Sequence, residues 1–211
     1  MRTVIVDYNS GNLHSAEKSA RRMAAEAGAG DVILASEADI IAEADRIILP
    51  GVGAFADCRA SLAAKGLDEA ICHAVENRGI PFLGICVGMQ LTAGFGLEHG
   101  CTKGFGWIPG KVVPIERFGN LKIPHMGWNS LRLIGTHPLF EGLGEGADVY
   151  FVHSYHLLPS QSGDCIAETD YGLPVTAAVA SGNVAGTQFH PEKSQQAGLR
   201  ILDNFFKWKP G

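Results

Sequence analysis

Residues 81–90 read Pro-Phe-Leu-Gly-Ile-Cys-Val-Gly-Met-Gln, and we expect the rest of the fold to form around them. The stretch predicts a short buried strand, a sharp turn and the first turn of a helix. Gly84-x-Cys86-x-Gly88 has the form of a nucleophile elbow, with cysteine where hydrolases carry serine. The glycines let strand and helix approach closely and leave Cys86 exposed on a strained turn. This pattern favours a reactive thiol over the alternative of a buried structural cysteine.

Short apolar runs and helical patterns alternate on the amino-terminal side of this stretch. Strands are predicted over 3–8, 31–35 and 46–49, and helices over 13–27, 55–64 and 67–77, the first of them with Asn12 as its N-cap. Such alternation predicts a mostly parallel central sheet with flanking helices, and therefore an α/β fold.

The pattern changes on the carboxyl-terminal side of residues 81–90. Residues 92–106 are rich in glycine and predict a short helix followed by a loop. From Trp107 onward, β-branched and aromatic runs recur without a long helical period, at 111–115, 130–134, 147–152, 164–169, 175–180 and 184–189. This half is predicted to be more antiparallel, and because no stretch has linker composition we expect residues 1–211 to form a single domain.

Composition limits the classes of function. The net charge of −5 provides no basic surface for nucleic acid, and no apolar run is long enough to span a membrane. The apolar stretch before Asp7 is too short for a signal-peptide core, so a cytoplasmic location is expected. The five cysteines show no paired C-x-x-C spacing, which argues against a disulfide framework or a zinc site. His153 and His156 in an extended stretch should point to opposite faces, so no metal site is expected.

His190-Pro191-Glu192 lies at the end of the last predicted strand. Pro191 keeps His190 out of helical geometry and forces a turn before Glu192. A carboxylate two residues after a histidine can hold its imidazole in one tautomer, so the pattern predicts a general base and its orienter. Ser194 is the predicted N-cap of a final helix. The apolar stripe of that helix would comprise Ile201, Leu202, Phe205 and Phe206.

A second glycine loop, Gly51-Val52-Gly53, follows the predicted strand 46–49. The segment from Gly51 to Ala56 formally matches G-x-G-x-x-A, but a dinucleotide fingerprint belongs to the first strand–helix unit and needs a later ribose-binding acid. No cofactor is therefore expected. The loop could instead present a backbone N–H to a developing oxyanion, or it could be a plain turn between strand and helix.

Taken together, these motifs resemble the class I (triad) glutamine amidotransferases, whose order of nucleophile, histidine and glutamate they share over nearly the whole chain. Further motifs resemble the glutaminase subunits of imidazole glycerol phosphate synthases. These are Asp7-Tyr8-x-x-Gly11-Asn12, Pro124-His125-Met126-Gly127-Trp128-Asn129, Tyr150-Phe151-Val152-His153-Ser154-Tyr155 and His190-Pro191-Glu192-Lys193-Ser194. The resemblance implies a flavodoxin-like architecture. Segment 92–106 departs from the family in being more glycine-rich.

The resemblance also implies an activity and a partner. Cys86, His190 and Glu192 would hydrolyse L-glutamine to glutamate and ammonia through a thioester. The ammonia would pass to a (β/α)₈-barrel cyclase subunit, in a heterodimer that makes imidazole glycerol phosphate and aminoimidazole carboxamide ribotide for histidine biosynthesis. The implied oxyanion donors are the backbone N–H groups of Val87 and of Val52 or Gly53. The implied substrate-binding residues are Gly51, Gly53, Gln90, Ser154 and Tyr155, and the implied partner contacts are Trp128, Tyr150 and Lys193.

Alternatives remain open at the level of sequence. One is the glutaminase subunit of another ammonia-channelling synthase, of the pyridoxal phosphate or anthranilate type, although such a chain is not expected to carry 124–129 as written. Another is a binding module that kept the fold and lost catalysis, against which the intact triad argues. Trp128 could also be a core residue, and Lys193 merely solvated.

Overall fold

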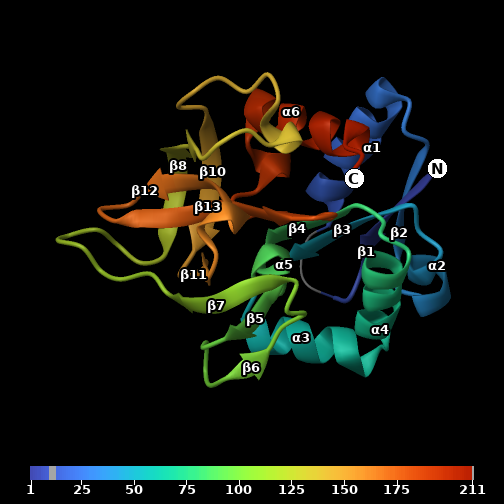
Figure 1. Ribbon diagram of the computed structural model, residues 1–211, viewed down its shortest axis with the longest axis horizontal. Coiled ribbons are helices and arrows are strands. Elements are labelled where there is room, and N and C mark those ends of the chain that lie inside the picture. Colours follow the sequence, from blue (N-terminus) through green and yellow to red (C-terminus); the bar gives the residue numbers. More distant parts are fainter. Residues whose placement is uncertain (10–12, 211) are drawn as a thin grey trace.

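The computed structural model describes residues 1–9 and 13–210. Within this part of the chain the largest sheet has eight strands, in the order β2-β1-β3-β4-β14-β13-β12-β9. The strands from β2 to β14 pair in parallel, and those from β14 to β9 pair antiparallel. The predicted division into a parallel first half and a more antiparallel second half is therefore confirmed, as Figure 1 shows.

The bounds of the strands in this sheet agree closely with the predicted runs in the first half. They are β1 (Arg2–Val6), β2 (Asp31–Ala35), β3 (Arg46–Gly51), β4 (Phe82–Cys86), β9 (Arg132–Leu133), β12 (Cys165–Asp170), β13 (Pro174–Ser181) and β14 (Val184–Thr187). The strands β3 and β4 are buried at every position, as expected for parallel strands covered on both faces.

Helices cover both faces of the parallel strands. The α-helices are α1 (His14–Ala27), α2 (Ala38–Ala42), α3 (Phe55–Ala64), α4 (Leu67–Cys72), α5 (Val87–Gln90) and α6 (Gln195–Lys207). The shorter helical turns are η1 (His73–Asn77), η2 (Pro138–Phe140), η3 (Ser162–Asp164) and η4 (Pro191–Lys193). Figure 1 shows α1 packed beside α6 on one side of the sheet, with α3 and α4 on the other.

The predicted stripe of α6, formed by Ile201, Leu202, Phe205 and Phe206, is buried in the core. Ser194 precedes α6 as predicted, but its hydroxyl makes no capping bond. It donates instead to the carbonyl of His190 at 2.6 Å and accepts from the N–H of Tyr150 at 3.0 Å. The predicted capping bond was therefore wrong, because this hydroxyl joins Tyr150 to the turn that carries His190.

Two smaller sheets lie beside the main one. One pairs β8 (His125–Ser130) with β10 (Asp148–His153), and the other joins β11 (Tyr155–Pro159), β7 (Ile108–Pro114), β5 (Ala93–Gly96) and β6 (Thr102–Lys103). The prediction of a helix and then a loop over 92–106 was wrong in part. The helix α5 is short and ends at Gln90, but the segment after it contains β5 and β6 because Ala93 and Phe95 pair with β7.

Three further points differ from the sequence analysis or lie beyond it. Residues 126–129 were not predicted as a strand, yet they belong to β8, where pairing with β10 extends them. The helix α2 was not predicted because it is short. The proposed N-cap Asn12 lies outside the described residues. In the described part of the chain, no helix is both long and apolar enough to cross a membrane.

Candidate active site

Cys86 stands at the sharp turn between β4 and α5. Its backbone angles are φ 55° and ψ −112°, a conformation that costs a residue other than glycine about 1–3 kcal/mol. A side chain at Gly88 would overlap the carbonyl of Leu49, and one at Gly84 would overlap the backbone of Gly88. Only glycine fits at these two positions, so the turn is a nucleophile elbow in geometry as well as in sequence. Cys86 is nevertheless only 5% exposed, and it faces a cavity rather than the outer surface.

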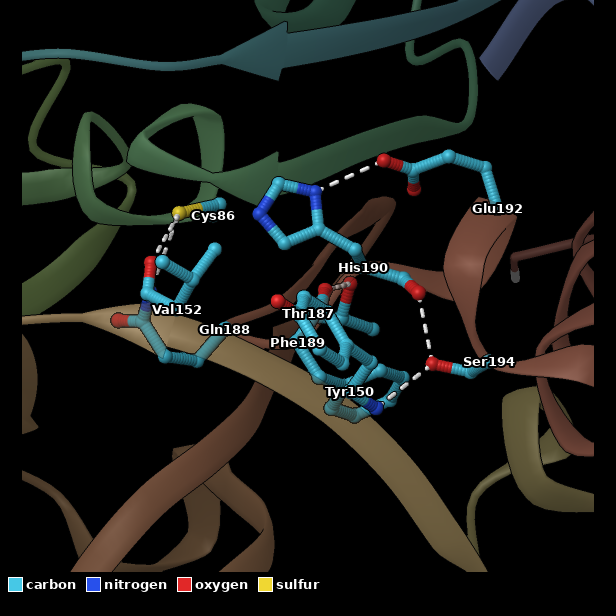
Figure 2. Close-up of polar contacts among 9 residues, drawn as sticks. All are labelled: Cys86, Tyr150, Val152, Thr187, Gln188, Phe189, His190, Glu192 and Ser194. Atoms are coloured by element: carbon cyan, nitrogen blue, oxygen red, sulfur yellow. Dashed lines mark hydrogen bonds and ion pairs between the residues drawn. The ribbon is translucent and has the colours of Figure 1, made fainter. Parts of the chain in front are cut away.

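His190 is brought to Cys86 by the sheet itself. The strands β4 and β14 are parallel neighbours, with Thr187 paired to Ile85, so their carboxyl ends meet at one edge. His190 follows β14 in an extended conformation, at φ −97° and ψ 99°, and Pro191 starts η4 after it. Figure 2 shows the imidazole between the two other members of the predicted triad, with one nitrogen toward Cys86 and one toward Glu192.

Glu192 fixes the tautomer of His190. The carboxylate Oε1 lies 2.8 Å from Nδ1 of the ring, and both side chains are almost fully buried. A carboxylate accepts, so Nδ1 carries the proton and Nε2 is left for Cys86. Among the described residues, Nε2 of His190 has no hydrogen-bond partner within ordinary geometry. The ring is therefore held through Nδ1, and its Nε2 faces Cys86.

The charge of His190 depends on its two neighbours. Burial by itself lowers the pKa of His190, but hydrogen bonding and charge from Cys86 and Glu192 outweigh it and raise the pKa to about 9. The imidazole of His190 is therefore held in its protonated form at neutral pH.

A cavity of about 270 Å³ opens beside Cys86 and His190. Of the predicted oxyanion and substrate residues, all but Gly51 line it, namely Val52, Gly53, Val87, Gln90, Ser154 and Tyr155. Gly51 lies behind the wall, where a side chain would strike the backbone of Gly88. A larger hollow of about 570 Å³ contacts α1 and α6, but no histidine or cysteine is among its lining residues. The smaller cavity is therefore the candidate active site, since a triad needs a nucleophile and a base together.

The glycine loop runs beside the elbow because Gly51 pairs with Cys86 across β3 and β4. Gly53 has φ +116°, a conformation that strains any other residue. The carbonyl of Val52 accepts a hydrogen bond from the Cys58 thiol, with the two atoms 3.6 Å apart. The loop therefore borders the place where an oxyanion would form, and its role as a donor of N–H groups stays a prediction.

A comparison with known protein sequences agrees with this arrangement of a cysteine elbow, a buried histidine and an orienting glutamate. The family model described as "Glutamine amidotransferase class-I" matches residues 4–208. The chain belongs to this family. It is also 54% identical to the "Imidazole glycerol phosphate synthase subunit HisH" of Ruegeria pomeroyi and 56% identical to that of Rhizobium meliloti, over the full length of each chain.

Solved structures of amidotransferases share the fold at low sequence identity. A crystal structure of a glutamine amidotransferase superposes with a TM-score of 0.73 and 17% identity, covering 97% of this chain and 99% of its own. A glutamine amidotransferase from Thermotoga maritima gives a TM-score of 0.64 and 15% identity, covering 91% of this chain and 76% of its own. The flavodoxin-like architecture implied by the resemblance is therefore confirmed.

Glu98 and Gln188 are among the residues of this amidotransferase site that the sequence analysis missed. Glu98 lines the cavity, and its carboxylate accepts a 2.8 Å hydrogen bond from the N–H of Phe55. Gln188 is fully buried and its amide nitrogen lies 3.6 Å from the sulfur of Cys86. The sequence held a signal for each of them. Glu98 is a carboxylate within the glycine-rich segment, and Gln188 is an amide at the end of a buried strand.

The three predicted partner contacts lie together, with Lys193 beside the aromatic pair that Trp128 and Tyr150 form across β8 and β10. Trp128 and Tyr150 are directly paired across the strands, with ring centroids 6.1 Å apart. Lys193 Nζ lies 5.9 Å from the centroid of the Tyr150 ring, within range of a cation–π interaction. Trp128 is 49% exposed, so the alternative of a core tryptophan is excluded.

Proposed function

We propose that this chain is the glutaminase subunit of an imidazole glycerol phosphate synthase. It hydrolyses L-glutamine to glutamate and ammonia, and it supplies the ammonia to a cyclase subunit in histidine biosynthesis. The single observation that carries the proposal is the arrangement of Cys86 and His190 at one cavity, with Glu192 bound to His190. The full-length similarity to subunits of that name selects this synthase among the amidotransferases.

The reaction would follow the chemistry of a cysteine triad. The Cys86 thiolate attacks the side-chain amide carbon of glutamine, and His190 carries the proton that came from the thiol. His190 gives that proton to the departing nitrogen, so that ammonia leaves and a thioester remains. A water molecule then attacks the thioester, His190 takes its proton, and the thiol and glutamate are released. Glu192 holds the ring in one tautomer and stabilises its charged form.

The negative oxygen of each tetrahedral intermediate needs hydrogen-bond donors. The N–H of Val87 directly follows the nucleophile, and the loop formed by Val52 and Gly53 borders the cavity across from it. We assign the oxyanion hole to these groups. Loss of one such donor costs roughly 100- to 1,000-fold in turnover.

The amino-acid end of glutamine would bind farther along the cavity. Glu98 is an acid on its wall, and a carboxylate there suits the α-ammonium group of the substrate. The backbone of Ser154 and Tyr155 borders the same space and supplies further polar groups. Gln90 lines the cavity, while its amide nitrogen is bound to the carbonyl of Tyr155 at 2.9 Å.

The partner would be a (β/α)₈-barrel cyclase subunit, bound as a heterodimer through the surface of Trp128, Tyr150 and Lys193. A half-exposed aromatic residue supported by a second ring and a cation is typical of an interface anchor. The pair would work in the cytoplasm, where histidine synthesis takes place.

The deciding experiment combines the chain with the cyclase subunit of the same cell. The wild-type pair should form glutamate and imidazole glycerol phosphate from glutamine, and Cys86→Ala should abolish both. With ammonium salt in place of glutamine, the Cys86→Ala pair should still make imidazole glycerol phosphate. Glutamate formation by the Cys86→Ala chain would show that the nucleophile is wrongly assigned. A wild-type pair that makes no imidazole glycerol phosphate from glutamine would favour a different synthase.

A further inference from the structure

The fully buried side chain of Gln188 contacts the sulfur of the nucleophile. Its amide nitrogen Nε2 lies 3.6 Å from Cys86 Sγ, and its oxygen Oε1 lies 3.0 Å from Nε2 of Gln90. The Cys86 sulfur also contacts the carbonyl of Val152 at 3.9 Å. Figure 2 shows Gln188 and Val152 beside the sulfur.

The orientation of the Gln188 amide follows from its neighbours. The Gln90 amide nitrogen contacts two oxygens, that of Tyr155 at 2.9 Å and that of Gln188 at 3.0 Å. The Tyr155 carbonyl can only accept, so this end of Gln90 must be its NH₂ group. Both of its hydrogens are then used, and the group it meets on Gln188 must be the oxygen. The nitrogen of Gln188, which only donates, therefore faces the sulfur.

The donor and acceptor roles at the far end of this series of contacts are determined as well. The Tyr155 carbonyl also lies 2.9 Å from Nδ1 of His153, whose Nε2 lies 3.1 Å from Nδ1 of His125. Burial lowers the pKa of His153 to about 3 and that of His125 to about 4, so both rings are neutral at pH 7. Tyr155 can only accept, so His153 carries its proton on Nδ1 and accepts from His125. In each hydrogen bond of the series, it is therefore determined which group donates and which accepts.

We propose that Gln188 is a positioning residue for Cys86, with Gln90 as its orienter. Its N–H holds the sulfur in place and stabilises the thiolate, because hydrogen bonds to a charged form favour that form. The Val152 carbonyl can accept only from the neutral thiol, so of these two contacts the one with Gln188 survives ionisation. This inference rests on the proposed role of Cys86 as nucleophile.

Other ionisable groups lie around this sulfur and its cavity, and the experiment must leave them in place. His190 and Lys193 come from the segment after β14, with Glu192 behind His190. Glu98 lies on the cavity wall after β5, His153 ends β10, and Cys58 approaches from α3. A change confined to position 188 keeps all of these and removes only the amide donor.

The test uses Gln188→Leu and Gln188→Glu in the full chain. The rate at which iodoacetamide alkylates Cys86 is measured against pH by mass spectrometry of the peptide that contains it. We expect the pH of half-maximal rate to rise by about one unit in Gln188→Leu, which reduces alkylation about tenfold at pH values well below both midpoints. Gln188→Glu has the same size but places a carboxylate beside the sulfur, so it should raise the pH of half-maximal rate further. In the complex with the cyclase subunit, kcat should fall about tenfold while KM for glutamine changes less than threefold.

Asn204→Leu provides a matched control for the loss of a buried amide. Asn204 donates to the carbonyls of Leu139 and Glu141, remote from the cavity. It should lower the melting temperature without changing the alkylation profile. If the Gln188 variants lower the melting temperature but alkylate with the wild-type pH profile, Gln188 is only structural and the inference is overturned.

A measurement on the wild-type chain covers the case in which neither variant folds. The side-chain NH₂ resonances of Gln188 should shift over the same pH range as the alkylation rate, and Cys86→Ala should abolish that shift. Constant resonances across this range would overturn the inference. Glutaminase activity retained in Cys86→Ala would instead refute the proposed function, so the two failures are distinguishable.

Discussion

Nδ1 of His125 lies 3.1 Å from Nε2 of His153, and the two buried rings form one cross-strand pair at the junction of β8 and β10. The His125 ring is stacked between Phe151 and Tyr171, with ring centroids 4.6 Å and 4.0 Å away. His125 Nε2 lies 3.3 Å from the amide nitrogen of Asn129, which donates to it. A proton added to either ring would remove an acceptor that this pair needs, so the neutral state is part of the folded structure.

Stability should therefore fall in mild acid. Burial lowers the pKa of His156 to about 4, as it does for His125, whereas a histidine in the unfolded chain titrates near its ordinary value of about 6.5. Between these values the unfolded chain binds more protons, so the free energy of unfolding rises with pH there and falls as pH drops from 6.5 toward 4. Each such histidine contributes a slope of up to about 1.4 kcal/mol per pH unit.

His156 allows a clean test, because its buried Nδ1 has no hydrogen-bond partner among the described residues. In His156→Leu, the number of protons taken up on unfolding should fall by about one. This number is obtained from the slope of the unfolding free energy against pH, measured by urea denaturation at several pH values between 4.5 and 8. The variant should gain stability relative to wild type as the pH is lowered. An unchanged slope would mean that this ring is not buried neutral.

The catalytic roles of His190 and Glu192 should separate in kinetics. His190→Ala removes the base, whose contribution is about 100- to 10,000-fold. Glu192→Gln keeps a group that accepts from Nδ1 but removes its charge, so it should reduce turnover less. It should also lower the pKa of His190, which Cys86 and Glu192 together raise to about 9 against the effect of burial. The measurement is kcat against pH for both variants in the complex. Equal losses in two folded variants would contradict this division of roles.

Glu98 is expected to affect binding rather than chemistry. Glu98→Gln keeps an oxygen for the N–H of Phe55 but removes the charge that would meet the substrate's ammonium group. We expect KM for glutamine to rise about tenfold, a cost close to that of one charge-assisted hydrogen bond, with kcat nearly unchanged. Steady-state kinetics in the complex will measure both. A fall in kcat at constant KM would place Glu98 in the chemical step instead.

Trp128 should be the anchor of the partner surface. Trp128→Ala is expected to weaken assembly with the cyclase subunit by more than tenfold, since buried aromatic anchors are worth about 2 kcal/mol or more. Leu158→Ala is the matched control, because Leu158 is an exposed apolar residue, 39% accessible, on β11. Titration calorimetry gives both affinities. Equal affinities of the two variants for the cyclase subunit would show that the interface lies elsewhere.

Glutaminase activity should also be conditional on the partner. A loop with glycine at both ends can reorient a peptide group at low cost, and partner docking could select the orientation that faces the oxyanion. Glutamine hydrolysis should rise from the isolated chain to the complex and again when a ligand fills the cyclase site. Gly53→Ala meets no steric obstacle but strains the backbone at φ +116°, so it should reduce this increase. Hydrolysis by the isolated chain at the rate of the liganded complex would refute conditional activation.

The sequence predicted those features that depend on neighbours in the chain. The elbow at Cys86 follows from two glycines within two residues of it, and the His190–Glu192 pair follows from a proline-enforced turn. The alternation of strands and helices up to residue 86 depends on local periodicity, so it too was predicted. The segment 92–106 and β8 were not, because their strands have no period of their own and are extended only by pairing with β7 and β10.

Local sequence determined the chemistry of this protein, whereas only the tertiary structure decided its geometry. The elbow and the His-Pro-Glu turn are each complete within a few residues. Their meeting depends on the parallel pairing of β4 with β14, a choice made by the packing of the whole sheet. The contacts of Gln188 with Cys86, and of His125 with His153, likewise join distant segments. No local pattern encodes such contacts, because the free energy that stabilises them comes from burying both partners together.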